Sequence, residues 1–376
     1  FYGDKGCVEH TQENLDADGN GFKLPYIHEI DGCQVPSWVS NTVWYQIFPE
    51  RFSNGNPNLT PDGAREWDAA IAPNIDDFFG GDLQGIIDHL DYLKDLGITG
   101  LYLCPIFEAT TNHKYDTTDY FEIDRHFGDK GVFRNLVEEA HKRGIKIMLD
   151  AVFNHIGDQS AQWQDVLKNG ENSVYKDWFH IQEFPVTEDK LQNPRQLPYH
   201  TFAFASYMPK LNTANPEVKD YLLRVATYWI ENFDIDAWRL DIANKIDHQF
   251  WKDFRKAVLA KKPDLYILGE IWHTSQPWLQ GDEFHAVMNY PLSERIKDYF
   301  LRQRKKTEQF ISEINSQSMY YKQQISEVMF NLLDSHDTER ILTTAKGNIQ
   351  HVKAALTFLY LQKGTPCIYY GTELAL

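Results

Sequence analysis

From residue 43 onward, short apolar runs of strand length alternate with stretches of helical periodicity. The expected strands span residues 43–48, 98–104, 145–149, 235–240, 265–268, 284–288, 328–333 and 367–370. Eight strands that alternate with helices favour an α/β fold, specifically a (β/α)₈ TIM barrel whose inner wall is a ring of parallel strands. A doubly wound open sheet is the alternative, but it more often has a glycine-rich phosphate-binding turn after its first strand. Here Pro49 and Glu50 follow the first strand, and no such turn is present.

The stretches between the strands have the marks of amphipathic helices. Residues 84–96 repeat apolar side chains at helical spacing and close on Gly97, which predicts one helix. Residues 132–143 show the same pattern. Asn215 followed by Pro216 predicts the start of another helix, because Asn is a favourable cap and Pro fits the first helical position.

The spacing of these elements predicts the domain organisation. Residues 1–40 show no clear periodicity, and we expect a remnant of an N-terminal domain followed by a linker. About 60 residues separate the third strand from the helix at Asn215, too many for an ordinary connection, so we expect an inserted subdomain at 156–207. The barrel would then comprise 41–155 and 208–376. The eighth strand is followed by few residues, so we expect the last barrel helix to be missing.

Four of the apolar runs end in a cluster of polar side chains. These are residues 145–155, 235–244, 265–273 and 328–340, which finish in carboxylates, histidines or an arginine. The C-terminal ends of barrel strands meet at one face, and barrel enzymes keep their chemistry there. The four clusters therefore predict an active site.

Two of the clusters supply carboxylates in different surroundings. Strand alternation places Arg239 and Asp241 on the same face, so we expect the guanidinium to lower the pKa of Asp241, as suits a nucleophile. Glu270 ends a very apolar strand, and we expect burial to raise its pKa, as suits a general acid. Such a pair is typical of glycoside hydrolysis. A structural salt bridge at Asp241 and a surface charge at Glu270 are the simpler alternatives.

Other functional classes fit the sequence less well. A metal site is the competing reading of the His, Asp and Glu residues at the strand ends, but the HExxH spacing of zinc enzymes is absent. No GxSxG motif of a serine hydrolase occurs. The net charge of −17 argues against a nucleic-acid partner, and no apolar run is long enough for a membrane span. The abundant aromatics, 10 Trp, 20 Tyr and 23 Phe, suit a ligand with flat apolar faces such as a sugar, and one or two from the insertion could reach the cleft.

The chain resembles the α-amylase family of glycoside hydrolases. The segments DAVFNH (150–155), WRLDIAN (238–244), GEIWH (269–273) and LLDSHD (332–337) are similar to its four main motifs in order and spacing. The segments MPKLN (208–212), GGDLQGI (80–86) and HKYDTTDYFEID (113–124) resemble the neopullulanase, cyclomaltodextrinase and maltogenic amylase subgroup. The resemblance implies a barrel with an insertion after its third strand and a later C-terminal β-domain that is missing from this chain.

The resemblance assigns roles residue by residue. It implies that Asp241 is the nucleophile, Glu270 the acid/base and Asp337 a third carboxylate that binds sugar hydroxyls at the −1 subsite. Arg239 would orient the nucleophile. The remaining substrate-binding residues that it implies are Tyr115, His155, Asn244, Trp272 and His336.

Two departures from the subgroup concern specificity and calcium. The residue after Asn244 is commonly Glu in the subgroup and is Lys245 here, which opens the question of α-1,4 against α-1,6 preference. The subgroup has a structural calcium loop, whose matching positions here are Asn54, Asn56, Gly80 and Asp82. Leu59 and Thr60 occupy two further ligand positions and are poor ligands for a hard cation. We expect a weak or empty Ca²⁺ site, and no cofactor for the chemistry.

The sequence thus predicts a retaining hydrolase of α-glucan oligosaccharides, with some transglycosylation. A general or maltogenic α-amylase that acts on starch is the second hypothesis, and a non-catalytic glucan-binding barrel is the third. No signal-peptide pattern opens the chain, and we expect a cytoplasmic protein. The resemblance implies a homodimer for the full-length protein and a monomer for this fragment.

Overall fold

The computed structural model describes residues 2–3, 6–17, 32–68, 71–186 and 194–376. The chain divides into two units, Phe1–Cys33 and Gln34–Leu376. The first unit contains the antiparallel pair β1 (Tyr2–Gly3) and β2 (Gly6–Cys7) and the helix α1 (Gln12–Asp16). The predicted remnant at 1–40 lies partly outside the described residues, and its boundary stays a prediction.

The second unit is built on eight parallel strands that form a barrel. The order around the sheet is β10-β9-β8-β7-β4-β3-β12-β11, and a parallel bridge between Met288 and Phe330 joins its two edges. The predicted (β/α)₈ barrel is therefore confirmed, and each of the eight expected runs overlaps one of its strands, although β7, β9 and β12 extend one or two residues beyond the expected bounds. The strands are β3 (Trp44–Ile47), β4 (Gly100–Leu103), β7 (Lys146–Ala151), β8 (Ala237–Leu240), β9 (Tyr266–Gly269), β10 (Ala286–Val287), β11 (Phe330–Asn331) and β12 (Thr365–Tyr369).

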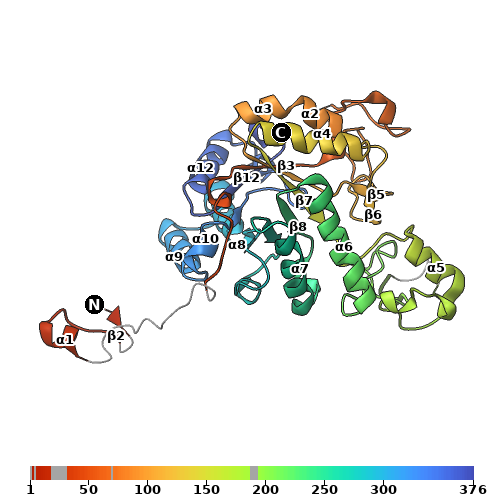
Figure 1. The fold of residues 1–376 in the computed structure, drawn as a ribbon. Helices are drawn as coiled ribbons and strands as arrows, with labels where there is room; N and C mark the ends of the chain where they lie inside the picture. Colours follow the sequence, from red (N-terminus) through yellow and green to blue (C-terminus); the bar gives the residue numbers. More distant parts are fainter. Residues whose placement is uncertain (1, 4–5, 18–31, 69–70, 187–193) are drawn as a thin grey trace. The chain divides into compact units, whose positions relative to one another are not determined.

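The strands form from continuous apolar runs because both of their faces are covered. Every residue of β3, β4, β8 and β9 is buried, as expected where side chains fill the barrel on one face and helices cover the other. Figure 1 shows helices around the strands, with α6 and α7 beside β8. The principal helices are α2 (Leu83–Asp88), α3 (Leu90–Asp95), α4 (Lys130–Lys142), α6 (Pro216–Phe233), α7 (His248–Lys261), α8 (Tyr290–Ile296), α9 (Thr307–Ser318), α10 (Gln323–Ser326), α11 (Ile341–Thr344) and α12 (Ile349–Tyr360).

One predicted helix is interrupted. The sequence predicts a single helix over 84–96, but the structure has α2 and α3 with a break at His89. The ring Nδ1 of His89 lies 2.7 Å from the carbonyl oxygen of Gly85, which an uninterrupted helix would pair with the backbone N–H of His89. That N–H donates instead to the carbonyl of Ile86, so the chain tightens locally and starts a new helix. The predicted start at Asn215 is confirmed, since its side chain accepts from the N–H of Glu217.

Two features beyond the barrel repeat position the site. A hairpin of β5 (Phe107–Ala109) and β6 (Thr117–Ile123), which the sequence does not predict, lies between β4 and α4. Between β7 and α6 the chain forms α5 (Ala161–Asn169), short 3₁₀ turns and isolated bridges such as His155 to Lys210. Figure 1 shows α5 well away from the barrel strands. Residues 187–193 lie outside the described part, and the boundaries 156–207 of an inserted subdomain stay a prediction.

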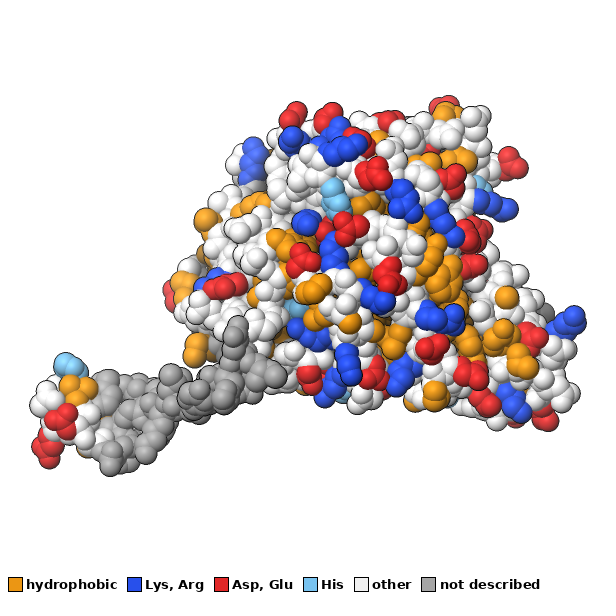
Figure 2. Space-filling view, in the orientation of Figure 1, with side chains coloured by type: hydrophobic (Ala, Val, Ile, Leu, Met, Phe, Trp, Pro, Cys, Tyr) orange, Lys and Arg blue, Asp and Glu red, His pale blue; other side chains and the backbone are white. Residues whose placement is uncertain are grey.

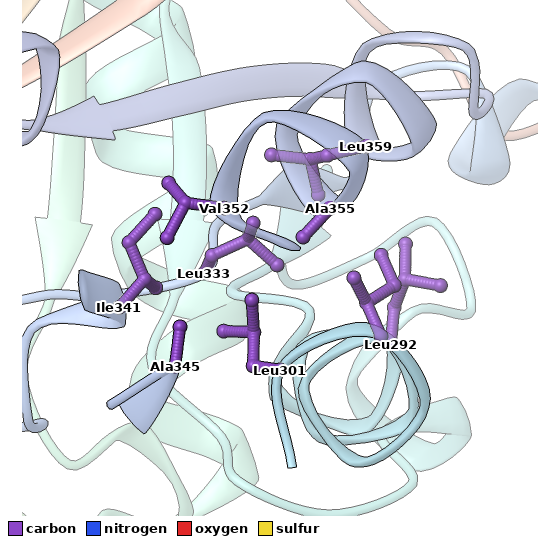
Figure 3. Close-up of a cluster of buried hydrophobic side chains, with 9 residues drawn as sticks. Leu292, Leu301, Leu333, Ile341, Ala345, Val352, Ala355 and Leu359 are labelled. Atoms are coloured by element: carbon purple, nitrogen blue, oxygen red, sulfur yellow. The ribbon is translucent and has the colours of Figure 1, made fainter. Parts of the chain in front are cut away.

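A cluster of buried apolar side chains supports the end of β11, from which the polar cluster at 334–337 continues. Figure 3 shows Leu333 among side chains of α12, α11 and α8. The buried members are Leu292, Ile296, Leu301, Leu333, Ile341, Ala345, Val352, Ala355 and Leu359. Because Leu333 lies just before the polar residues, its packing fixes the direction in which they leave the strand.

We expect Leu333→Ala to lower the free energy of unfolding by about 2–5 kcal/mol, since it removes a buried side chain and leaves a cavity. Leu333 is 1% exposed. Urea denaturation followed by circular dichroism measures the change. Leu361→Ala is the matched control, because Leu361 is 78% exposed and its loss should change stability by no more than about 0.5 kcal/mol. Equal stability of the two variants would contradict this view of the cluster.

Candidate active site

A cavity of about 640 Å³ opens at the C-terminal ends of the barrel strands. Its lining combines carboxylates, histidines and aromatic rings that are far apart in the sequence. The lining residues that the sequence singles out are Tyr115, His155, Asp241, Glu270, Trp272, His336 and Asp337. The structure therefore brings the predicted catalytic carboxylates to one place. Arg239 lies buried beneath them, and Asn244, in the 3₁₀ turn Ala243–Lys245, does not line the cavity.

The guanidinium of Arg239 is shared by three carboxylates. Its side chain is 0% exposed, and its Nη1 donates to Asp150 Oδ1 at 2.9 Å and to Asp241 Oδ1 at 2.7 Å. Its Nη2 lies 2.9 Å from Glu270 Oε2 as an ion pair. The alternation of β8 puts Arg239 and Asp241 on the same face, as predicted. One cation thus faces three buried acids, and their proton affinities depend on one another.

The pKa shifts of the two carboxyls are opposite to those expected from the sequence. Burial raises the pKa of Asp241 well above its ordinary value, and the neighbouring Glu270 and Asp150 add to the rise against the opposing effect of Arg239. The pKa of Glu270 is lowered, because Arg239, the N–H of Ile242 and the indole of Trp272 together outweigh its burial. The expectation of a lowered Asp241 and a raised Glu270 is therefore wrong for this state. The reason is that Glu270 meets more donors than Asp241 does.

A strained turn after β8 supplies one of these donors. Ile242 has φ 42° and ψ 45°, a left-handed conformation that a β-branched residue rarely adopts. The conformation directs its backbone N–H to Glu270 Oε2 at 2.8 Å. Such strain persists where the surrounding structure enforces it, and it is concentrated at functional sites.

Trp272 supplies the other donor. Its Nε1 donates to Glu270 Oε1 at 2.9 Å. The indole is stacked on Tyr290, with ring centroids 3.7 Å apart and an interplanar angle of 6°. Trp272 is 47% exposed, so one face of a large aromatic ring is available at the cavity.

The floor of the cavity is a hydrogen-bonded network around Tyr115. Its hydroxyl donates to Asp150 Oδ2 at 2.8 Å and lies 2.5 Å from His336 Nε2. The Tyr115 and His336 rings are stacked, with centroids 5.3 Å apart. His155 Nε2 lies 3.1 Å from the carbonyl oxygen of Tyr115. Burial lowers the pKa of His155 to about 3 and that of His336 to about 4, so both rings are neutral near pH 7 and can each both donate and accept hydrogen bonds.

Asp337 lies at the edge of this network. Its side chain is 38% exposed to the cavity, and its Oδ2 is 3.2 Å from His336 Nε2. Burial raises the pKa of Asp337 to about 6, and the charge of Glu270 adds to the rise against the opposing charge of Arg239. At neutral pH most Asp337 side chains are therefore ionised and can accept hydrogen bonds from hydroxyl groups.

Further lining residues come from two irregular segments of the chain. Phe202 and Tyr207 belong to the long segment between β7 and α6, which confirms that one or two of its aromatics reach the cleft. Phe202 is stacked on His155, with ring centroids 5.0 Å apart. Phe48 and Ile75, from the segment after β3, also line the cavity. The sequence pattern does not identify Ile75 as a lining residue, because an exposed isoleucine in an irregular loop fits neither strand nor helix periodicity.

Lys210 holds the turn that contains Lys245, the residue at which the chain departs from the subgroup. Lys210 Nζ donates to Asn154 Oδ1 at 2.5 Å and to the carbonyl oxygen of Lys245 at 3.0 Å. Burial, followed by the charge of Lys245, lowers the pKa of Lys210 to about 8.

The positions of the predicted calcium loop do not fit a tight cation site. The carboxylate of Asp82 accepts backbone N–H groups of Gly55, Asn56 and Gly85, at 2.7 to 3.2 Å, and so serves as the cap of α2. Asn54 Nδ2 donates to Thr60 Oγ1 at 2.7 Å. Calcium needs six to eight oxygen ligands, and the one carboxylate of the set is already occupied by donors.

Comparison with known proteins identifies the family to which the chain is similar. A model of the alpha-amylase catalytic domain matches residues 46–376. An intracellular maltogenic amylase of Bacillus subtilis is 57% identical over 376 residues, which are 100% of this chain and 62% of that protein. A cyclomaltodextrinase of Geobacillus thermopakistaniensis is 58% identical over 355 residues, which are 94% of this chain and 59% of that protein. This chain thus spans less than two thirds of the length of these relatives.

Solved structures give the same result for the fold. A cyclomaltodextrinase structure has a TM-score of 0.90 at 52% identity, with 95% of this chain and 60% of that chain covered. The ligand-free cyclic alpha-maltosyl-(1→6)-maltose hydrolase from Arthrobacter globiformis has a TM-score of 0.87 at 43% identity, with 91% and 76% covered. Within the described part of our chain, no helix is both long and apolar enough to cross a membrane.

We expect calcium at about 100 µM to change the melting temperature by no more than about 1 °C relative to a chelator, because a ligand stabilises the fold only above its dissociation constant. Differential scanning fluorimetry measures the change, with magnesium as the control for ionic strength. A rise of many degrees at micromolar calcium would show that the loop binds the ion tightly.

Proposed function

This chain belongs to the α-amylase family of glycoside hydrolases, and from that premise we propose that it hydrolyses α-glucosidic bonds with retention of anomeric configuration. The observation that supports this proposal most is the meeting of Asp241, Glu270 and Asp337 at one cavity above the barrel strands. Two carboxyl groups on either side of a scissile bond suffice for glycoside hydrolysis in two displacements.

In the first displacement the ionised form of Asp241 attacks the anomeric carbon and forms a covalent glycosyl ester. The bond to the leaving oxygen breaks as Glu270 donates a proton to it. In the second displacement Glu270 accepts a proton from water, which attacks the same carbon and releases Asp241. Arg239 holds Asp241 at 2.7 Å and fixes its direction throughout.

Binding of one glucose unit follows from the groups around the carboxylates. The neutral His155 and His336 and the ionised Asp337 can bind sugar hydroxyls, and Tyr115 offers an aromatic face. Further aromatic rings, including Phe202 and Trp272, suit additional sugar units along the cleft.

The substrate class rests on the relatives. Proteins named cyclomaltodextrinase, maltogenic amylase and neopullulanase share 49% identity or more with this chain. We infer hydrolysis of α-1,4 bonds in cyclomaltodextrins, maltodextrins or pullulan, with some transglycosylation. A maltogenic or general α-amylase acting on starch is the second candidate, favoured by the name of a maltogenic alpha-amylase of Bacillus acidopullulyticus that is 53% identical to this chain. Product profiles on β-cyclodextrin, pullulan and soluble starch separate the two.

Location and assembly are part of the proposal. The Bacillus subtilis relative is named intracellular, and this supports a cytoplasmic protein. On the face shown in Figure 2, acidic and basic side chains are interspersed, in keeping with small neutral substrates rather than a polyanion. The resemblance to the subgroup supports a homodimer for a longer chain.

We expect Glu270→Gln to lower kcat on maltoheptaose by about 10²–10⁴-fold, because the leaving oxygen loses its proton donor. Asp241→Asn should abolish turnover, because no covalent intermediate can form. Glu122→Gln is the matched control: Glu122 is 55% exposed and pairs with Lys130 only on the surface. Proton NMR of early products by the wild type should show the α-anomer. A β-anomer, or full activity of Glu270→Gln, would contradict the assignment.

A second expectation concerns chain length. We expect this chain to sediment as a monomer and to hydrolyse β-cyclodextrin with a lower kcat/KM than a chain extended to the length of the relatives, since the resemblance implies that a preceding domain completes the cleft of a partner. Analytical ultracentrifugation and cyclodextrin assays of both chains measure the two properties. Equal oligomeric state and equal kcat/KM would contradict this part of the proposal.

A further inference from the structure

Glu270 is surrounded by donors in this structure. Its Oε1 accepts from Trp272 Nε1 at 2.9 Å, its Oε2 accepts from the N–H of Ile242 at 2.8 Å, and Arg239 Nη2 lies 2.9 Å from Oε2. An indole, a backbone amide and a guanidinium can donate but not accept. A proton on either oxygen would therefore face another proton. These contacts stabilise the ionised form, whereas the proposed acid step needs the protonated form.

Of the three donors, only Trp272 can be released without rearranging the barrel. The N–H of Ile242 is fixed by the turn after β8, whose next residue donates its own N–H to the carbonyl oxygen of Glu270. Arg239 is fully buried and bound to Asp150 and Asp241. Trp272 is 47% exposed and lies in the loop after β9, where its main described contact besides Glu270 is the stack on Tyr290.

The position of Trp272 relates this release to substrate. Trp272 and Glu270 line the same cavity, and the indole covers the oxygen of Glu270 that Arg239 and Ile242 leave free. A sugar whose glycosidic oxygen approaches Oε1 must occupy the space of the indole N–H. The same approach would bring the sugar against the exposed indole face, which offers an apolar contact in exchange.

We propose that Trp272 is a positioning residue: its indole N–H holds Glu270 ionised in the free enzyme, and a glucan that enters the cavity displaces the indole, so that Oε1 takes up a proton for the leaving oxygen. The inference rests on the proposed glycosidase function. The proton is taken up from the bulk solvent as the indole leaves: Oε1 gains it, transfers it to the glycosidic oxygen and recovers one from the attacking water, and that proton returns to the solvent when the product leaves and the indole binds Glu270 again. The free enzyme would thus keep its acid in an inactive protonation state until substrate arrives.

Other charged and titratable groups also act on Glu270, and among them only Tyr290 packs against the indole of Trp272. The lowered pKa of Glu270 reflects Arg239 first, and then the hydrogen bonds from Ile242 and Trp272. The groups that face it from the neighbouring elements are Arg239 and Asp241 from β8 and its turn, His336 and Asp337 from the segment after β11, and Tyr290 from α8. Removal of the indole N–H therefore takes away one hydrogen-bond donor to Glu270 and keeps the other groups that act on its pKa.

Trp272→Phe tests the inference, because phenylalanine keeps a ring to stack on Tyr290 and removes the N–H. A hydrogen bond donated to the charged form lowers a pKa, so its loss raises the pKa of Glu270. We expect the pH profile of kcat/KM, which reports the free enzyme, to move upward by about one pH unit, the size of one charge-assisted hydrogen bond. The profile of kcat should keep its position, because the indole has already left Glu270 in the complex.

Trp278→Phe is the matched control. Trp278 lies in the same loop region, in the 3₁₀ turn Gln276–Trp278, and its Nε1 makes no hydrogen bond within the described residues. Both of its profiles should match the wild type. Unchanged profiles in Trp272→Phe, or an equal shift of both profiles, would overturn the inference, because the indole would then act only through packing or would remain bound to Glu270 in the complex.

A spectroscopic measurement separates this inference from the proposed function. The indole ¹⁵N–¹H signal of Trp272, identified by its absence in Trp272→Phe, should titrate with pH in the free protein and should lose that titration in Glu270→Gln. This result needs no hydrolysis, so it holds even if no glucan is cleaved. A signal that is insensitive to pH, or one that titrates equally in Glu270→Gln, would overturn the inference while leaving the glycosidase assignment intact.

Discussion

One buried guanidinium, that of Arg239, faces three carboxylates, and the chemistry of the site depends on how it is shared. Asp150, Asp241 and Glu270 all lie within 3.0 Å of its nitrogen atoms. A buried charge without a partner costs several kcal/mol, so each of the three acids depends on this cation for its ionised form. One positive charge cannot neutralise three negative charges, so at least one of the three carboxyl groups must hold a proton. The distribution of those protons decides which carboxyl can attack and which can donate.

The barrel makes this arrangement possible because it brings strand ends together. Asp150 and Arg239 are paired in register across β7 and β8, and Glu270 follows β9, the next strand. Side chains at the same level of neighbouring parallel strands meet without any long connection. The strained backbone of Ile242 and the indole of Trp272 then distinguish Glu270 from Asp241 by adding donors to one carboxyl only.

The sequence predicts the barrel strands correctly and the directions of the pKa shifts of Asp241 and Glu270 wrongly, and both results have physical reasons. The strands are continuous apolar runs that are buried on both faces, and strand alternation alone places Arg239 beside Asp241. The pKa directions depend instead on donors from other elements, such as Trp272, whose orientation no local pattern encodes. The break at His89 was missed for a similar reason, since one side chain competes for a carbonyl inside an otherwise regular helical pattern. The hairpin of β5 and β6 positions Tyr115. Its strands are short and partly polar, so their pattern does not stand out from the longer apolar runs of the barrel.

The most direct test of the account is the identity of the residue that becomes glycosylated. An activated α-glucosyl fluoride needs no proton donor for its leaving group, so Glu270→Gln should still form the covalent intermediate and should release it slowly for want of a base. Mass spectrometry of the digested protein should then find one glucosyl unit on the peptide that contains Asp241. A glucosyl unit on Asp337 or any other carboxylate, or no adduct while substrate is consumed, would contradict the roles assigned to the carboxylates around Arg239.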